Sequence, residues 1–428
     1  MSEQLLNLQL AKYLRTRALT SPWKIEPCLR TDFTAVVVIP ALAEFETLPE
    51  TLAALGRNPL SALAETLIVV VVNHRASASA THKVDNRKTL AWLKTQPCPG
   101  LNLAWVDACS SGRELPDKDG VGLARKIGCD LALSHLDWTA SPLVIALDAD
   151  TLVDASYLPA IFAHFRRNSS AGTYLPFRHQ TADTPAQEAA MRRYELYLRS
   201  YQFGLQLAGS PYAFIALGSA LACRAQAYVA AGGMKRRLAG EDFYFLQQLV
   251  KTGGVSALCG TLVKPAARYS ARVPFGTGQA LSAEVEEGRQ LYQFVSHAGF
   301  AVLNGWLSLI QSQPAAQADR LLACAEQLSP LLRQYLDETG FAAAWDRLQQ
   351  NAGRGSLLTA FHHWFDGLRT RQLLMRLETA SPPLPPEGLV AELLAAGGYP
   401  GLYKGVDQLQ FLEQQQGVPA QEPREKTG

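Results

Sequence analysis

Short apolar runs rich in β-branched residues place the strongest constraint on the fold of this chain. Residues 35–40 read AVVVIP, residues 67–72 read LIVVVV and residues 143–147 read LVIAL. Runs of this length, bounded by polar or turn-forming residues, are typical of strands buried on both faces of a sheet. Segments with a helical apolar stripe lie between them, such as 47–55 and 121–133. This alternation predicts an α/β fold with a mostly parallel sheet between two layers of helices.

Polar side chains follow the ends of the expected strands. Glu44 comes after the first strand along the chain, Asn73 after the second and Asp107 after a third. Asp148 and Asp150 come after the fourth. Ligands of parallel α/β sheets bind outside the carboxyl ends of the strands. These side chains therefore predict one binding site at that edge.

Asp148 and Asp150 are separated by one residue, so in an extended chain both side chains point the same way. Two converging carboxylates repel each other unless a cation lies between them. Hard divalent ions prefer such oxygen ligands and usually bind a substrate phosphate as well. The pair predicts a metal site, with Mg²⁺ or Mn²⁺ as the cofactor. A solvated turn without a ligand is the alternative interpretation.

The composition narrows the class of protein. The 428 residues include 40 Lys and Arg against 38 Asp and Glu, a formal charge of +2, which gives no support for nucleic-acid binding. Seven scattered cysteines without a Cys-x-x-Cys pair indicate reduced thiols and a cytoplasmic protein. No signal-peptide pattern and no apolar stretch of about 20 residues is found. A peripheral membrane contact stays open.

The chain is expected to contain four parts. Residues 1–33 predict a helical lead-in, 34–280 the α/β domain, 281–413 a helical C-terminal domain and 414–428 a disordered tail. Within the α/β domain, the polar stretch 76–89 predicts a loop. The C-terminal helices could form an acceptor platform, a homodimer interface or a dock on a membrane surface.

Short motifs recur in a fixed order between residues 33 and 280. They are VVIPALAE at 37–44, GVGLARKIG at 120–128, DAD at 148–150, GS at 218–219, GGM at 232–234 and GED at 240–242. Their order and spacing resemble those of the family 2 glycosyltransferases, which have the Rossmann-like GT-A fold. Each motif is short, and the specificity of the resemblance lies in the series.

The resemblance implies transfer of a sugar from a nucleoside-diphosphate sugar to a hydroxyl of an unknown acceptor, which could be a saccharide, a lipid-linked molecule or a small molecule. The departing diphosphate needs positive charge nearby, which a metal and Arg268 or Arg272 would supply. Lys126, beside Arg125, could touch the donor or lie on an exposed helix face. The residues expected to bind the donor are Pro40, Glu44, Asn73, Asp107, Arg125, Asp148, Gly218, Arg268 and Arg272.

The acceptor hydroxyl must lose a proton as it attacks, and a carboxylate can take it. Similar enzymes place an Asp at the start of the helix after the GED segment. That role maps to Asp242, with Glu241 as its neighbour. A helix N-terminus favours the anionic form of a carboxylate. We therefore expect single displacement with inversion at the anomeric carbon, with a simple helix cap as the alternative role of Asp242.

Departures from the family pattern leave other functions open. No Gln-x-x-Arg-Trp motif of processive synthases is found, so the transfer is expected to be non-processive. No histidine occurs between Gly253 and His297 to complete a metal site. A haloacid-dehalogenase-type phosphatase would need Thr where Leu152 stands, and a sugar nucleotidyltransferase a Gly-rich basic loop at 41–46. A catalytically inactive nucleotide-sugar-binding protein of the same fold is the remaining alternative.

Overall fold

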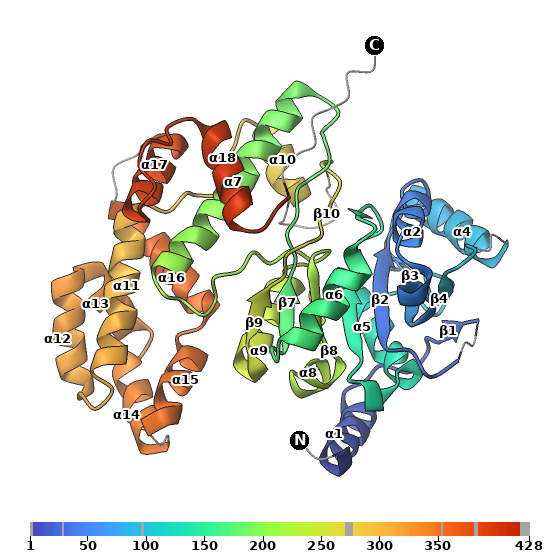
Figure 1. Cartoon of the computed structure of the whole chain (residues 1–428), viewed down its shortest axis with the longest axis horizontal. Coiled ribbons are helices and arrows are strands. Elements are labelled where there is room, and N and C mark those ends of the chain that lie inside the picture. Colours follow the sequence, from blue (N-terminus) through green and yellow to red (C-terminus); the bar gives the residue numbers. More distant parts are fainter. Residues whose placement is uncertain are drawn as a thin grey trace. The chain divides into compact units, whose positions relative to one another are not determined.

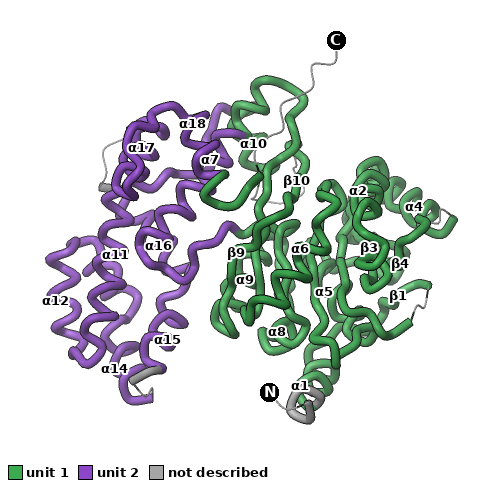
Figure 2. Tube along the Cα trace, viewed as in Figure 1, with its two compact units in different colours: residues 1–191, 216–287, 414–428 green, residues 192–215, 288–413 purple. Residues whose placement is uncertain are grey.

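The computed structural model describes residues 3–27, 30–95, 98–269, 277–351, 354–380 and 384–419. The chain divides into two compact units, coloured separately in Figure 2. Unit 1 consists of residues 1–191, 216–287 and 414–428, and unit 2 of residues 192–215 and 288–413. Each unit is therefore built from segments that are discontinuous in sequence, whereas the domains predicted from the sequence are continuous ranges. In particular, residues 192–215 belong to the helical unit.

Unit 1 is built on an eight-stranded sheet with the order β1-β4-β3-β2-β5-β8-β7-β9. Strands β4, β3, β2 and β5 are parallel to one another, while β5 pairs with β8 and β8 with β7 in antiparallel fashion. A separate two-stranded sheet joins β6 (Leu152–Val153) to β10 (Val263–Lys264). The strands of the large sheet are β1 (Ile25–Glu26), β2 (Ala35–Ala41), β3 (Thr66–Asn73), β4 (Asn102–Ala108), β5 (Leu143–Ala146), β7 (Gly172–Tyr174), β8 (Leu221–Arg224) and β9 (Val255–Ala257).

The central strands are buried along their whole length. Every residue of β2 and β3 is buried, as expected for β-branched runs with helices on both faces. Helix α5 packs on both strands, and a Cβ added to its Gly128 would lie 2.8 Å from Cγ2 of Val71. Glycine at this position thus brings the helix close to the sheet.

Figure 1 shows the helices of unit 1, most of which lie beside the sheet. They are α1 (Glu3–Thr16), α2 (Leu48–Gly56), α3 (Leu60–Ala64), α4 (Ala80–Thr95), α5 (Val121–Ala132), α6 (Tyr157–Arg167), α8 (Ala225–Ala230), α9 (Glu241–Gly253) and α10 (Thr277–Glu286). Two short 3-10 turns cover Leu133–His135 and Trp138–Ala140. Helix α7 (Pro185–Leu207) begins in unit 1 and continues in unit 2.

The described residues of unit 2 form helices joined by turns and irregular segments, and the unit has an aromatic core. Trp306 lies at its centre, with ring centroids 5.0 Å from Phe341, 6.0 Å from Phe361 and 6.4 Å from Phe365. All four side chains are buried. Besides α7, its helices are α11 (His297–Ser312), α12 (Ala318–Leu328), α13 (Pro330–Glu338), α14 (Phe341–Asn351), α15 (Arg354–Trp364), α16 (Gly367–Leu377), α17 (Pro386–Ala396) and α18 (Gly405–Gln415), with a 3-10 turn at Glu378–Ala380.

The predicted α/β fold, with a largely parallel central sheet followed by a helical region, is confirmed. The loop predicted for 76–89 is wrong, because α4 begins at Ala80. Helix α18 continues to Gln415, past the expected start of the tail, and residues 420–428 lie outside the described residues. Across the described ranges, no helix combines the length and the apolar character needed to cross a membrane.

Candidate active site

The carboxyl ends of β2 and β5 carry the acidic residues that the sequence singles out. The two strands are parallel neighbours, so both ends lie at the same edge of the sheet. Glu44 lies three residues past the end of β2, and Asp148 and Asp150 lie just past the end of β5. Connections between parallel strands leave this edge open for ligands.

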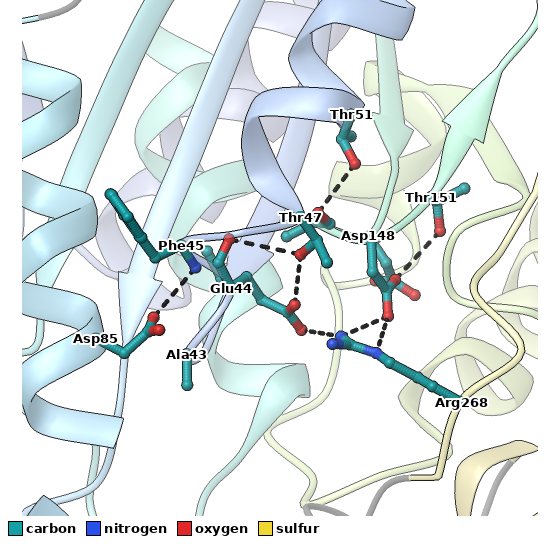
Figure 3. Close-up of polar contacts among 12 residues, drawn as sticks. Ala43, Glu44, Phe45, Thr47, Thr51, Asp85, Asp148, Thr151 and Arg268 are labelled. Carbon is teal, nitrogen blue, oxygen red and sulfur yellow. Dashed lines mark hydrogen bonds and ion pairs between the residues drawn. The ribbon is translucent and has the colours of Figure 1, made fainter. Parts of the chain in front are cut away.

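Arg268 connects Glu44 to Asp150, and we name these three residues the Arg268 cluster. Figure 3 shows the guanidinium of Arg268 beside the carboxylate of Glu44. Its Nε atom donates to Oδ2 of Asp150 at 2.9 Å, and its Nη2 atom lies 2.6 Å from the same oxygen. Nη2 also donates to Oε1 of Glu44. The hydroxyl of Thr47 donates to the other oxygen of Glu44 at 2.7 Å. One guanidinium therefore neutralises part of the charge of two carboxylates that are over a hundred residues apart in sequence.

Arg125 makes an equivalent connection deeper in the unit, and we name Asp148, Arg125 and Glu241 the Arg125 cluster. Arg125 lies on α5 and is only 3% exposed. Its Nη2 atom donates to Oδ1 of Asp148 and its Nη1 atom to Oε1 of Glu241. A Cβ at Gly218 would be 2.7 Å from the guanidinium carbon, so only glycine leaves the guanidinium this space. Both terminal nitrogens of Arg125 thus hold carboxylates, and the donor-binding roles expected for Arg125 and Gly218 stay predictions.

The first turn of α9 presents the two expected catalytic carboxylates. Gly240 precedes the helix with φ of +72°, a conformation that glycine adopts without strain. Glu241 and Asp242 follow in the first turn. Glu241 is turned to Arg125, while Oδ1 of Asp242 accepts the backbone N–H of Phe243 at 2.7 Å. The two neighbours thus have different partners, and Asp242 remains partly exposed.

Burial makes several of these carboxylates easier to protonate. It raises the pKa of Asp150 to about 6, because the attraction of Arg268 only partly offsets burial and the nearby charges of Glu44 and Asp148. It likewise raises the pKa of Glu241 to about 7 against the opposing effect of Arg125. The pKa of Asp242 is raised as well, mainly by burial. Carboxyl groups with raised pKa values are suited to exchange protons near neutral pH.

The carboxylates after β5 suit a divalent ion that brings further ligands with it. The side chains of Asp148 and Asp150 are 34% and 20% exposed, so both can be reached from solvent. They turn to different arginines instead of meeting at one point. Among the residues that the structure describes, no group of three His, Cys, Asp or Glu side chains is placed to hold a metal. Mg²⁺ often uses only one or two carboxylates together with substrate phosphates, and that arrangement fits here.

Other residues expected at the site have structural partners. The amide of Asn73 is buried and donates to the carbonyls of Ala41 and Val71. Oδ1 of Asp107 accepts backbone N–H groups of its own loop, and Lys126 pairs with Asp130 at 2.8 Å. Their roles in donor binding stay predictions. Pro40 lies within β2, and Arg272 lies outside the described residues.

The loop that carries Glu44 is held by a helix that sequence reasoning missed. On α4, Asn86 accepts the backbone N–H of Ala43 at 2.9 Å, and Asp85 accepts that of Phe45 at 3.1 Å. Ala43 has φ of +54°, a conformation uncommon for a residue other than glycine. The sequence signal for α4 was its apolar pair Leu90 and Leu93, which are both buried in the structure.

Similar solved structures include one of TarS and one of a mannosyltransferase. S. aureus TarS 1-349 in complex with UDP-GlcNAc is 14% identical, with 89% of this chain and 91% of that chain covered and a TM-score of 0.37. The mannosyltransferase PcManGT from Pyrobaculum calidifontis, in complex with GDP-Man and Mn²⁺, is 15% identical, with 97% and 93% covered and a TM-score of 0.37. In the comparisons with protein-family models and curated proteins, nothing matches. Likenesses with TM-scores below 0.5 assign no function to this chain.

Proposed function

We propose that this chain is a glycosyltransferase of the family 2 type, which moves a sugar from a nucleoside-diphosphate sugar to an acceptor hydroxyl. One observation carries the proposal. Carboxylates from three distant segments, near residues 44, 150 and 241, gather around two arginines where parallel strands end. Such an edge suits a ligand with a diphosphate, whose negative charge the arginines can offset, and a sugar transfer in which a carboxylate accepts the acceptor's proton.

The donor diphosphate would lie beside the Arg268 cluster. Arg268 is 31% exposed, so its guanidinium can reach a ligand as well as its carboxylates. Two oxygens of a diphosphate match the forked donors of an arginine. A bound Mg²⁺ or Mn²⁺ held by Asp148 and Asp150 would stabilise the charge that develops on the departing diphosphate.

The acceptor hydroxyl would be deprotonated by Asp242. As its oxygen bonds to the anomeric carbon, the bond from that carbon to the diphosphate oxygen breaks and the hydroxyl proton passes to the carboxylate. Attack opposite the leaving group inverts the configuration of the sugar. The raised pKa of Asp242 strengthens it as a base relative to an exposed carboxylate.

The remaining features of the proposal follow from this chemistry and from the composition. The donor is a nucleoside-diphosphate sugar, and the acceptor is a saccharide, a lipid-linked molecule or a small molecule. Transfer is non-processive, and the protein acts in the cytoplasm without binding nucleic acid. The helices of unit 2 would supply an acceptor platform, a homodimer interface or a dock on a membrane surface.

The test is a screen of UDP- and GDP-sugars, with Mn²⁺ or EDTA, that measures both binding and turnover. We expect thermal stabilisation by one donor and release of its nucleoside diphosphate. Asp242→Asn should retain donor binding and lower turnover by about 100-fold or more. Asp319→Asn, in the first turn of α12, is the matched control and should turn over normally. Donor binding without turnover in every condition would favour the catalytically inactive alternative.

A further inference from the structure

We propose that Arg125 is a positioning residue that sets the catalytic turn of α9 in register with the donor-side carboxylate Asp148. The inference rests on the proposed function and deepens it, because it assigns to a buried arginine the alignment of the donor and acceptor halves of the site. Arg125 itself touches neither substrate in this assignment.

The first support is the way in which Arg125 uses its guanidinium. One terminal nitrogen holds Asp148 at the end of β5, and the other holds Glu241 at the start of α9. These partners lie 23 and 116 residues away from it in sequence. A planar fork with two fixed donor directions fixes the angle between its partners as well as their distance. A lysine could pair with either carboxylate but could not impose this geometry.

A second support comes from the start of α5, the helix that carries Arg125. A Cβ at Gly120 would lie 2.8 Å from the carbonyl oxygen of Leu238, and one at Gly122 would lie 2.9 Å from that of Arg237. The N–H of Gly122 also donates to the Arg237 carbonyl at 3.2 Å. The first turn of α5 is therefore pressed against the segment that leads into Gly240. Arg125 lies one turn further along and grips the next part of that segment.

A third support is the cost of the arrangement. Ion pairs removed from water contribute little net stability, and apolar replacements of similar size are often as stable. The Nε atom of Arg125 is buried and has no hydrogen-bond partner among the described residues, which adds to that cost. Fold stability alone thus gives a weak reason for an arginine here. Alignment of the two halves of the site gives a stronger reason, because a guanidinium donates to two carboxylates in fixed directions.

The test compares Arg125→Lys with the wild type for melting temperature, donor dissociation constant and kcat. Arg125→Lys keeps the charge but loses the fork. We expect its donor affinity to change far less than its kcat, which should fall by about 100-fold because misalignment of a reacting group has an effect of that size. Gly218→Ala, which pushes on the guanidinium without removing charge, should show the same division between binding and turnover.

A double-mutant cycle and a matched control complete the test. Glu241→Gln combined with Arg125→Lys should lower kcat by far less than the product of the single effects, because both changes break one connection. Arg224→Lys is the control, since Arg224 holds the carbonyls of Phe165, Asn168 and Ser170 in the same unit. It should lower the melting temperature and leave kcat unchanged.

Two results would overturn the inference: a kcat for Arg125→Lys close to wild type, or losses of kcat and donor affinity that run in parallel with the melting temperature. A wild-type protein that binds no nucleoside-diphosphate sugar would instead refute the proposed function, before any variant is compared.

Discussion

Replacement of Arg268 by alanine should change the ligand preference of the site in two opposite directions. Arg268 holds Glu44 and Asp150 through three contacts, two of them to one oxygen of Asp150. In Arg268→Ala these carboxylates face each other without the guanidinium between them. The free protein should then attract a divalent cation more strongly, while a nucleoside diphosphate loses a forked donor.

The size of both effects can be worked out from the contacts. Nη2 touches an oxygen of Asp150 and an oxygen of Glu44, so these oxygens are at most about 6 Å apart. At an effective dielectric constant of about 20, two unit charges at that distance repel by about 3 kcal/mol. Solvent reaches Asp150, which lowers the effective value to about 1–2 kcal/mol, or about tenfold in Mn²⁺ affinity. A lost charge-assisted hydrogen bond of about 1.5–3 kcal/mol weakens diphosphate binding by about 10- to 150-fold.

Titration calorimetry of UDP, GDP, uridine and guanosine in EDTA would measure the second effect, and Mn²⁺ titration followed by electron paramagnetic resonance the first. Lys264→Ala is the control, because Lys264 precedes Arg268 by only four residues but pairs with a different carboxylate, that of Asp154, at 2.9 Å. Equal weakening of the nucleosides and their diphosphates would refute the phosphate contact. Unchanged Mn²⁺ affinity would refute the assigned repulsion between the two carboxylates.

Two further predictions concern the same edge of the sheet. In metal-free buffer, Asp150→Asn should be more stable than the wild type at pH 7, by up to about 3 kcal/mol, and the difference should vanish near pH 4. The reason is that the pKa of Asp150 is raised in the folded state to about 6, so the folded protein binds more protons than the unfolded chain between about pH 4 and 6 and loses stability as pH rises through that range. A difference that grows toward acid pH in thermal melts would contradict the raised pKa. Asn86→Ala removes a buried amide that donates to the Asn73 carbonyl and accepts from the backbone N–H of Ala43. It should lower the free energy of unfolding by about 1–3 kcal/mol and raise KM for the donor. An unchanged KM would show that the Glu44 loop needs no support from α4.

The strands were predictable because they carry their signal locally. The β-branched runs that form β2 and β3 can hardly fold otherwise, and their polar successors had to reach one edge once the strands were parallel. Helix α4 was missed because its first half, up to about residue 89, is polar and its buried face becomes apolar only near Leu90. Tertiary contact, which no local pattern reports, decides its state. The pairing of Asp148 and Asp150 with two separate arginines could not be predicted for the same reason, because Arg125 and Arg268 lie 143 positions apart in the sequence.

The charges at this edge explain why the site combines raised pKa values with two arginines. Glu44, Asp148, Asp150, Glu241 and Asp242 would carry five negative charges when ionised, and Arg125 and Arg268 supply two positive ones, which leaves three in excess. A nucleoside-diphosphate sugar adds about two more negative charges through its phosphates. Such an anion approaches only if protons or a divalent cation offset the excess. The carboxyl groups with raised pKa values provide the first route, and the exposed sides of Asp148 and Asp150 provide the second. Donor affinity should therefore rise either on mild acidification in EDTA or on addition of Mn²⁺ at neutral pH, and an affinity that responds to neither would show that the phosphates lie elsewhere.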